Sequence, residues 1–219
     1  MTINLIINMI LLVASAAAFI RGALKNFRSK KALYIWLVTC AVGCAFVAAL
    51  FETIQIWVRP DLIGGYQLGL LGLVGEYLFF FTANHGEIDS LGDDGSKTFF
   101  KYRMISLVIS VILLAAFVPL AWMRGMRGFT LIVVLIVALV ITAALYYHIK
   151  HLIIPDVEDG ILKSMRYYNL IGIINCLAGL LSLLTIQGTV VWAITVVIRM
   201  IVVITVLPVM ERGVKRWTA

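Results

Sequence analysis

The sequence predicts an all-α membrane protein, a bundle of seven transmembrane helices. First, 63% of the 219 residues are apolar and only 13% are charged, whereas a soluble domain is about 45–50% apolar and about 25% charged. Second, the mean hydropathy is +1.06. Third, long apolar stretches recur along the whole chain. Seven spans of about 20 residues leave only short loops, so we expect residues 1–219 to form a single transmembrane domain.

The apolar stretches that are long enough to cross a bilayer end at charged residues. About 18 consecutive apolar residues mark a candidate transmembrane helix. The candidates are residues 3–20, 32–58, 62–83, 104–123, 129–149, 167–186 and 189–210.

The first span, residues 3–20, has the flanks of a retained helix. Ala14-Ser15-Ala16 imitates a signal-peptide cleavage site, but a signal peptide carries its positive charge before the apolar run. Here no basic residue precedes the run, and five follow it by Lys31. We therefore expect a helix with its N-terminus outside the cell.

The third span, residues 62–83, places small residues and one acid on a common helix face. Their spacing of four, three and four residues keeps them within about 40° of one line. Glycines at such spacing let another helix approach closely, so the acid is expected to face protein rather than lipid. The face consists of Gly65, Gly69, Gly72 and Glu76.

The last four spans differ in their polar content. The fourth and fifth contain no Asp, Glu, Lys or Arg. The sixth is preceded by the mixed segment 161–168, which contains Lys163 and Arg166 and is expected to lie at the interface. The seventh carries Arg199 near its middle.

The basic residues are distributed unequally between the two sides of the predicted bundle. Fourteen lysines and arginines lie on the side of the C-terminus and three on the other. Positive residues concentrate on the cytoplasmic side of membrane proteins, which predicts an outside N-terminus, a cytoplasmic C-terminus and a multi-pass protein of the cell membrane. We therefore interpret the net charge of +7 as a set of basic residues that orient the helices and favour anionic lipids as partners. It is not interpreted as a sign of nucleic-acid binding.

Ionisable residues inside a bilayer are costly and are functional candidates by default. Arg199 lies near the middle of its span, whereas Glu76 lies about four residues inward of the middle of its own span, an offset of about 6 Å at 1.5 Å per residue. We expect them to form a buried ion pair, which either fixes the helix register or takes part in binding a ligand or ion.

Further polar residues in the spans either line a hydrated path or join helices by hydrogen bonds. The candidates for binding a ligand or ion are Glu76, Arg199, Glu52, Gln55, Tyr66, Gln67, Asn175 and Thr195.

Gly179 of the sixth span is a further candidate for close helix packing, together with the three glycines of the third span.

The remaining reactive residues indicate no metal, cofactor or catalytic centre. The three cysteines lie within apolar spans and are interpreted as small hydrophobic residues. His85, His148 and His151 map to the cytoplasmic edge, beside acidic loops that we interpret as solvated. All lysines map to loops or ends, which argues against a retinal Schiff base, and no nucleophile motif is present.

Three functions remain open. The favoured one is binding or passage of a small polar or ionic species through the bundle, as in a transporter or channel. A second is a seven-helix sensory receptor or an assembly subunit, which would act with a protein partner or as a homo-oligomer; its layout is similar to the input regions of bacterial sensor proteins, without a diagnostic motif. A third is a lipid-modifying enzyme that uses the cytoplasmic histidines and acidic loops, although an enzyme is the weaker expectation.

Overall fold

The computed structural model describes residues 2–28, 31–58, 68–93, 95–155 and 161–217. Within these ranges all regular structure is helical, with no β-strand. The all-α fold class predicted from composition is therefore confirmed.

Eleven helical elements are described. They are α1 (Thr2–Asn26), α2 (Leu33–Val58), α3 (Gly69–Thr82), η1 (Ala83–Ile88), α4 (Asp89–Gly92), η2 (Lys97–Phe99), α5 (Phe100–Met123), α6 (Gly128–Ile153), α7 (Ile161–Ser164), α8 (Arg166–Leu184) and α9 (Val190–Trp217).

Six of the described helices are long and apolar enough to cross a membrane: α1, α2, α5, α6, α8 and α9. Their outward faces carry large apolar side chains, including Val13, Ile112 and Leu139, which are more than half exposed. Contiguous exposed apolar surface is unfavourable in water but suits contact with lipid. The chain therefore has the character of a multi-pass membrane protein.

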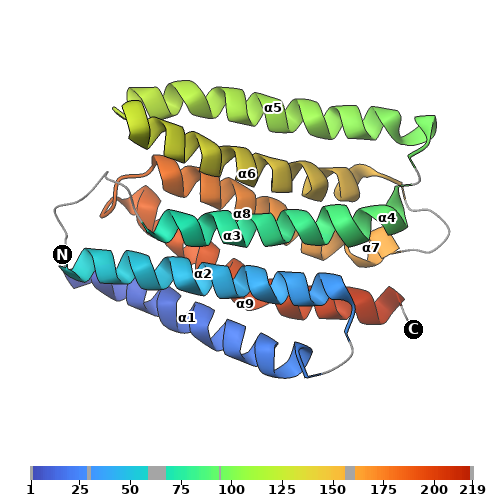
Figure 1. The fold of residues 1–219 in the computed structure, drawn as a ribbon, viewed down its shortest axis with the longest axis horizontal. Coiled ribbons are helices and arrows are strands. Elements are labelled where there is room, and N and C mark those ends of the chain that lie inside the picture. Colours follow the sequence, from blue (N-terminus) through green and yellow to red (C-terminus); the bar gives the residue numbers. More distant parts are fainter. Residues whose placement is uncertain (1, 29–30, 59–67, 94, 156–160, 218–219) are drawn as a thin grey trace.

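The described part of the third predicted span is shorter than the others. α3 begins at Gly69 and is 14 residues long, less than the about 20 that a crossing requires. The helix does not stop at Thr82, however, because α3 runs directly into the π-helical η1 and then into α4. Together these elements form one continuous helical rod from Gly69 to Gly92 (Figure 1).

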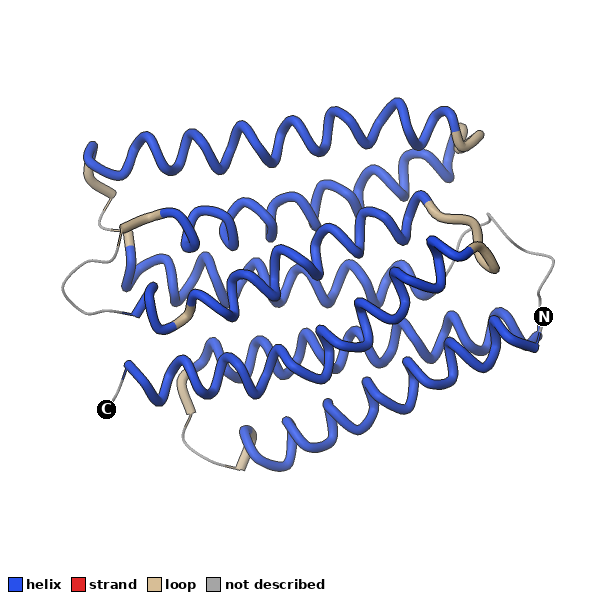
Figure 2. The backbone as a smooth tube through the Cα atoms, turned by 180° about the vertical axis from the view of Figure 1, so that it is seen from behind, coloured by secondary structure: helices blue, strands red, loops and turns tan. Residues whose placement is uncertain are grey.

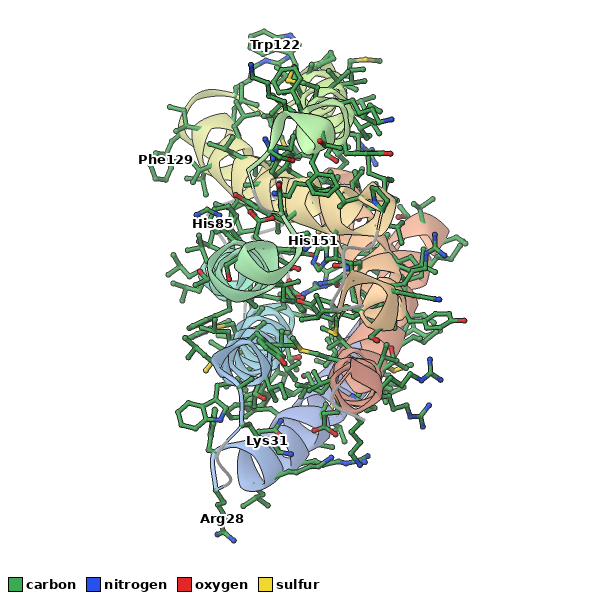
Figure 3. The ribbon with its side chains drawn as sticks, turned by 90° about the vertical axis from the view of Figure 1, so that its right-hand side faces the viewer. Arg28, Lys31, His85, Trp122, Phe129 and His151 are labelled. Carbon is green, nitrogen blue, oxygen red and sulfur yellow. The ribbon has the colours of Figure 1, made fainter. Side chains whose placement is uncertain are left out.

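Five of these elements close into a ring. α2 packs on α3, α3 on α6, α6 on α8, α8 on α9, and α9 again on α2. The view along the bundle shows α2 and α3 facing α8 and α9, with α6 closing one side (Figure 3). Side chains that point into this ring are shielded from lipid.

The two remaining long helices pack outside the ring. α1 lies across α2 and α9, whereas α5 contacts chiefly α6. These two are the least buried of the six candidate spans. The N- and C-termini lie at opposite ends of the bundle (Figures 1 and 2).

Glycines of α3 bring this helix close to α2. A Cβ added at Gly72 would lie 2.6 Å from the backbone nitrogen of Ala48, and one at Gly69 would lie 2.8 Å from Cγ of Glu52. A side chain at either position would force the helices apart. The predicted glycine face thus contacts α2 at these two residues, while Gly65 lies outside the described residues.

Several helices extend beyond the apolar spans expected from the sequence. α1 continues to Asn26, α6 to Ile153 and α9 to Trp217, because a helix can carry polar residues at its ends without unfolding. The segment after residue 83, predicted to be a loop, is helical as far as Gly92. Consequently Lys150, expected in a loop, lies on α6 and is buried.

Candidate functional site

The guanidinium of Arg199 on α9 lies between two carboxylates inside the ring of helices. Its Nη2 is 3.4 Å from Oε2 of Glu76 on α3, and its Nη1 is 3.8 Å from Oε1 of Glu52 on α2. Arg199 and Glu76 are 3% and 1% exposed, whereas 22% of the Glu52 side chain is exposed. The expected contact between Glu76 and Arg199 is present, and Glu52 joins it. We call these three residues the acid–arginine triad.

Asn175 on α8 connects the triad to a fourth helix. Its Nδ2 donates to Oε1 of Glu76 at 2.8 Å, and its backbone carbonyl accepts a hydrogen bond from the Tyr77 hydroxyl at 2.8 Å. The Tyr77 ring lies against Gly179, where an added Cβ would be 2.2 Å from the hydroxyl oxygen. Gly179 therefore makes room for a tyrosine that holds α3 and α8 together.

The contacts within the acid–arginine triad are long, and some of its polar atoms have no partner. Charge-assisted N–H···O bonds are usually about 2.7–2.9 Å long, and both Arg199 contacts are longer. Two buried atoms also lack a hydrogen-bond partner among the described residues, the donor Nε of Arg199 and the acceptor Oδ1 of Asn175. Buried polar atoms are normally satisfied, so the site has unused capacity both to donate and to accept.

The charges of the triad do not balance. Two carboxylates surround one guanidinium, so the fully ionised triad carries one excess negative charge in an apolar environment. A proton or a small cation would neutralise it. An anionic guest, which Arg199 alone would attract, would instead meet two carboxylates.

Comparison with known proteins identifies no relative of this chain. No protein-family model matches the chain, and no curated protein or solved structure matches it either. The functional argument therefore depends on the geometry of this chain's own residues.

Of the four predicted ligand-binding residues not yet placed, Thr195 and Gln55 lie within the described ranges. Thr195 is buried one helical turn before Arg199, but its hydroxyl donates to the carbonyl of Trp192 in the same helix at 2.7 Å. Gln55 is half-buried on α2, three residues after Glu52. Tyr66 and Gln67 lie outside the described residues.

A second buried polar cluster lies at the end of the bundle where α6 ends and α8 begins. The sequence analysis missed it and placed its histidines and acids at a solvated edge, which is wrong for His148 and His151: both rings are almost completely enclosed. We call it the end cluster. It consists of Asn84, Asp89, Asp93, Arg103, His148, Lys150, His151, Tyr168 and Asn169.

Two carboxylates neutralise the cations of the end cluster. Asp93 accepts from Nε of Arg103 at 2.7 Å and from Nζ of Lys150 at 2.9 Å. Asp89 contacts both Lys150 and Nε2 of His151, the latter at 2.9 Å. Lys150 can therefore be buried because two acids from a different part of the chain surround it.

Asp93, which follows the rod, has a perturbed proton affinity. Hydrogen bonds from Arg103, reinforced by Lys150, hold the pKa of Asp93 well below its usual range. Asp93 is thus expected to stay ionised at neutral pH.

The described residues of the two polar clusters do not gather the usual metal-binding side chains at one point. Within the part of the chain that the structure describes, no group of three or more His, Cys, Asp or Glu side chains is placed to hold an ion. Asp94 and the acids at 156–159 lie outside that part. The rings of His148 and His151 are also enclosed, which leaves a lipid head group no direct access to them.

Proposed function

We propose that the protein is a seven-crossing protein of the cell membrane that binds a small polar or ionic species at the acid–arginine triad and passes it through the bundle. The excess acid of the triad favours a proton or a small monovalent cation over an anion. The observation that carries this proposal is the pair of carboxylates on one buried guanidinium, deep within helices that are otherwise apolar. Such residues usually mark ion or proton pathways in membrane proteins.

The difference between the two acids supports passage rather than only structural pairing. Glu76 is enclosed, whereas Glu52 is partly exposed. A proton or cation could therefore reach Glu52 from the surface and exchange across Arg199 to Glu76. The unpartnered atoms of Arg199 and Asn175 could bind water that completes this transfer.

The proposed topology counts the rod from Gly69 to Gly92 as the seventh crossing. The rod contributes α3 to the ring of helices and packs against α2 and α6. The excess of basic residues around Arg28, Lys31 and the C-terminus supports a cytoplasmic location for that end, where anionic lipids would be the preferred partners.

Ion flux into liposomes tests the proposal. Purified protein is reconstituted into vesicles that contain a pH-sensitive dye, and a potassium diffusion potential is imposed; parallel vesicles receive sodium, potassium and chloride gradients. We expect proton or cation flux above that of protein-free vesicles, with loss of at least about tenfold in Glu76→Gln. Glu211→Gln, which removes an acid of α9 outside the triad, serves as the control and should retain the flux.

Two results would contradict the proposal. Vesicles that remain tight to every ion tested, with wild type and Arg199→Ala equally inert, would exclude passage and leave the receptor or assembly role. Flux that is unchanged in Glu76→Gln would place the pathway elsewhere in the bundle.

A further inference from the structure

The end cluster contains two buried histidines one turn apart on α6. His148 and His151 are 0% and 1% exposed, and the side chain of Asn84 in η1 lies between them. His151 lies inside the bundle, whereas His85 lies at its rim (Figure 3). The protonation of each ring is decided by what its two nitrogens face.

The amide of Asn84 has one orientation that satisfies its surroundings. Its Nδ2 lies 2.9 Å from the backbone carbonyl of Phe80, which can only accept, and 3.3 Å from the Tyr168 hydroxyl. The nitrogen must therefore occupy this position, which turns Oδ1 towards Nδ1 of His151, 3.3 Å away. The same nitrogen lies 3.5 Å from Nε2 of His148.

Asn84 thus presents an acceptor to one histidine and a donor to the other. In His151, Nδ1 faces the Asn84 oxygen and Nε2 faces Oδ1 of Asp89 at 2.9 Å. Both positions favour an N–H, which only the imidazolium supplies. In His148, Nε2 faces a donor while Nδ1 faces Oδ1 of Asn169 at 3.1 Å, so a neutral ring satisfies both.

The charges around His151 make protonation reversible. Burial of the ring opposes the imidazolium most strongly, and Lys150, which contacts the same Asp89 oxygen, opposes it too. Asp89 of α4 and Asp93 of the following loop favour it. The two acids already balance Lys150 and Arg103, so the bound proton gives the end cluster one net positive charge. Part of the Asp89 side chain, 18%, is exposed and offers the proton a way in.

We infer that His151 and Asp89 form a reversible proton-binding site at this end of the bundle, and that Asn84 confines the proton to His151 and away from His148. The rod that carries Asn84 and Asp89 also carries Glu76, eight residues before Asn84 or about 12 Å along the helix. If protons pass through the acid–arginine triad, this site would be the end of their pathway, and that role rests on the proposed function. Proton binding at the site does not depend on it.

Nitrogen NMR of the ¹⁵N-histidine-labelled protein in detergent tests the site directly. Single His→Gln variants at 85, 148 and 151 assign the three rings. At about pH 5, below the usual histidine pKa, we expect imidazolium signals from His151 and neutral signals, with the proton on Nδ1, from His148. A neutral His151 at this pH, or two buried rings that titrate together, would overturn the inference.

Two variants test the parts played by the neighbours. Asp89→Asn removes the counter-ion and should lower the midpoint of His151 protonation by at least about one pH unit. Asn84→Asp presents acceptors to both rings and should make His148 protonatable as well. An unchanged His151 midpoint in Asp89→Asn overturns the inference even if Asn84→Asp fails to fold.

The flux assay separates this inference from the proposed function. Imidazolium signals from His151 in a protein that passes no ion would support the site and refute passage. Proton flux that persists unchanged in His151→Gln, together with a loss in Glu76→Gln, would support passage through the triad and remove His151 from the pathway.

Discussion

Arg199 illustrates how a single buried charge recruits partners from several helices. A lone guanidinium in an apolar bundle is very unfavourable. Here Glu76 and Glu52 offset its charge from two other helices, and Asn175 holds Glu76 from a fourth. Glu76 and Arg199 could be recognised from the sequence because both interrupt apolar spans. The helical spacing of Glu76 with glycines also predicted that its side chain faces protein.

The participation of Glu52 could not be predicted in the same way. It lies in the outer part of its span, where an acid can also reach water, and its contact with Arg199 depends on the register of α2 against α3. That register follows from the close approach at Gly69 and Gly72, which is a tertiary property. Tyr77 was missed for a related reason, since an aromatic residue in an apolar helix carries no polar pattern.

Removal of either charge from the closer pair should destabilise the protein. Arg199→Gln is expected to cost about 3–5 kcal/mol, because it leaves the buried Glu76 carboxylate without its cation. Glu76→Gln should cost less, because Glu52 still faces Arg199. The double variant should cost clearly less than the sum of the two. Reversible unfolding of the purified protein in mixed micelles measures this double-mutant cycle.

Glu52→Gln is the matched control for the cycle. Glu52 is more exposed and lies farther from Arg199 than Glu76 does, so its loss should cost less than that of Glu76. Additive, harmless effects of the Glu76 and Arg199 substitutions would show that the two side chains are not coupled.

At the scale of elements, the contact between α2 and α3 depends on the absence of a side chain. Gly72→Ala should destabilise the protein by about 1–3 kcal/mol, because the new Cβ would lie within 2.7 Å of three Ala48 atoms and overpacking at this level is costly. Thermal unfolding in detergent measures the effect.

Gly86→Ala tests whether the effect at position 72 is one of packing. A Cβ at Gly86 would meet nothing within 4 Å, and alanine is favoured over glycine in helices by about 1 kcal/mol. We expect this variant to be neutral or slightly more stable. Equal losses at positions 72 and 86 would contradict a packing role for Gly72.

The link between α4, α5 and α6 should depend on pH. The pKa of Asp93 is lower in the folded protein than in the unfolded chain, so its ion pairs stabilise the fold above about pH 4, the unfolded value. This stabilisation is lost as the pH falls below that value. Thermal unfolding measured between about pH 7 and about pH 3 should show a falling midpoint.

Asp93→Asn should flatten this acid dependence because the titrating group is gone. Arg103→Gln should flatten it partly, because the Arg103 guanidinium is the main cause of the low Asp93 pKa. An acid dependence as steep in Asp93→Asn as in the wild type would show that other carboxylates cause it.

The π-helical segment joins the two polar clusters on one rod. η1 contains Asn84 and connects α3, which bears Glu76, to α4, which bears Asp89. π-helical turns are rare and occur frequently at functional sites. Hydropathy could not predict η1, because half of its residues, Asn84, His85 and Glu87, are polar and the segment after residue 83 indicated a loop.

At the scale of the whole molecule, the proposed orientation can be tested independently of function. Alkaline phosphatase is active only outside the cytoplasm, whereas green fluorescent protein folds only inside it. We expect a phosphatase fused within the turn between α5 and α6 to be active, and a fluorescent protein fused after Ala219 to fluoresce. The converse pattern, or two fusions that report the same side, would contradict seven crossings with the N-terminus outside.

The ring of helices explains why the buried polar side chains gather inside while the outer surface is largely apolar. α2, α3, α6, α8 and α9 surround the acid–arginine triad, and the end cluster lies at one end of the bundle, with Arg103 contributed by α5. α1 and α5 extend the lipid-facing surface on two sides (Figure 1). The lipid surface needs only apolar character, so hydropathy predicts it well. The interior needs specific pairs, which depend on which helices become neighbours.

The sequence by itself determined that this chain is helical and suited to a membrane, approximately where its helices run, and that Glu76 and Arg199 are charges in apolar surroundings. These properties follow from composition and from the helical period, which are local. Only the tertiary structure decided that Glu52 and Asn175 join Arg199 and Glu76, and that Lys150 and His151 are buried. The reason is physical: a charge can be buried only where opposite charges and hydrogen-bond partners from distant segments contact it. The local sequence around a charged residue does not show which distant segments these are.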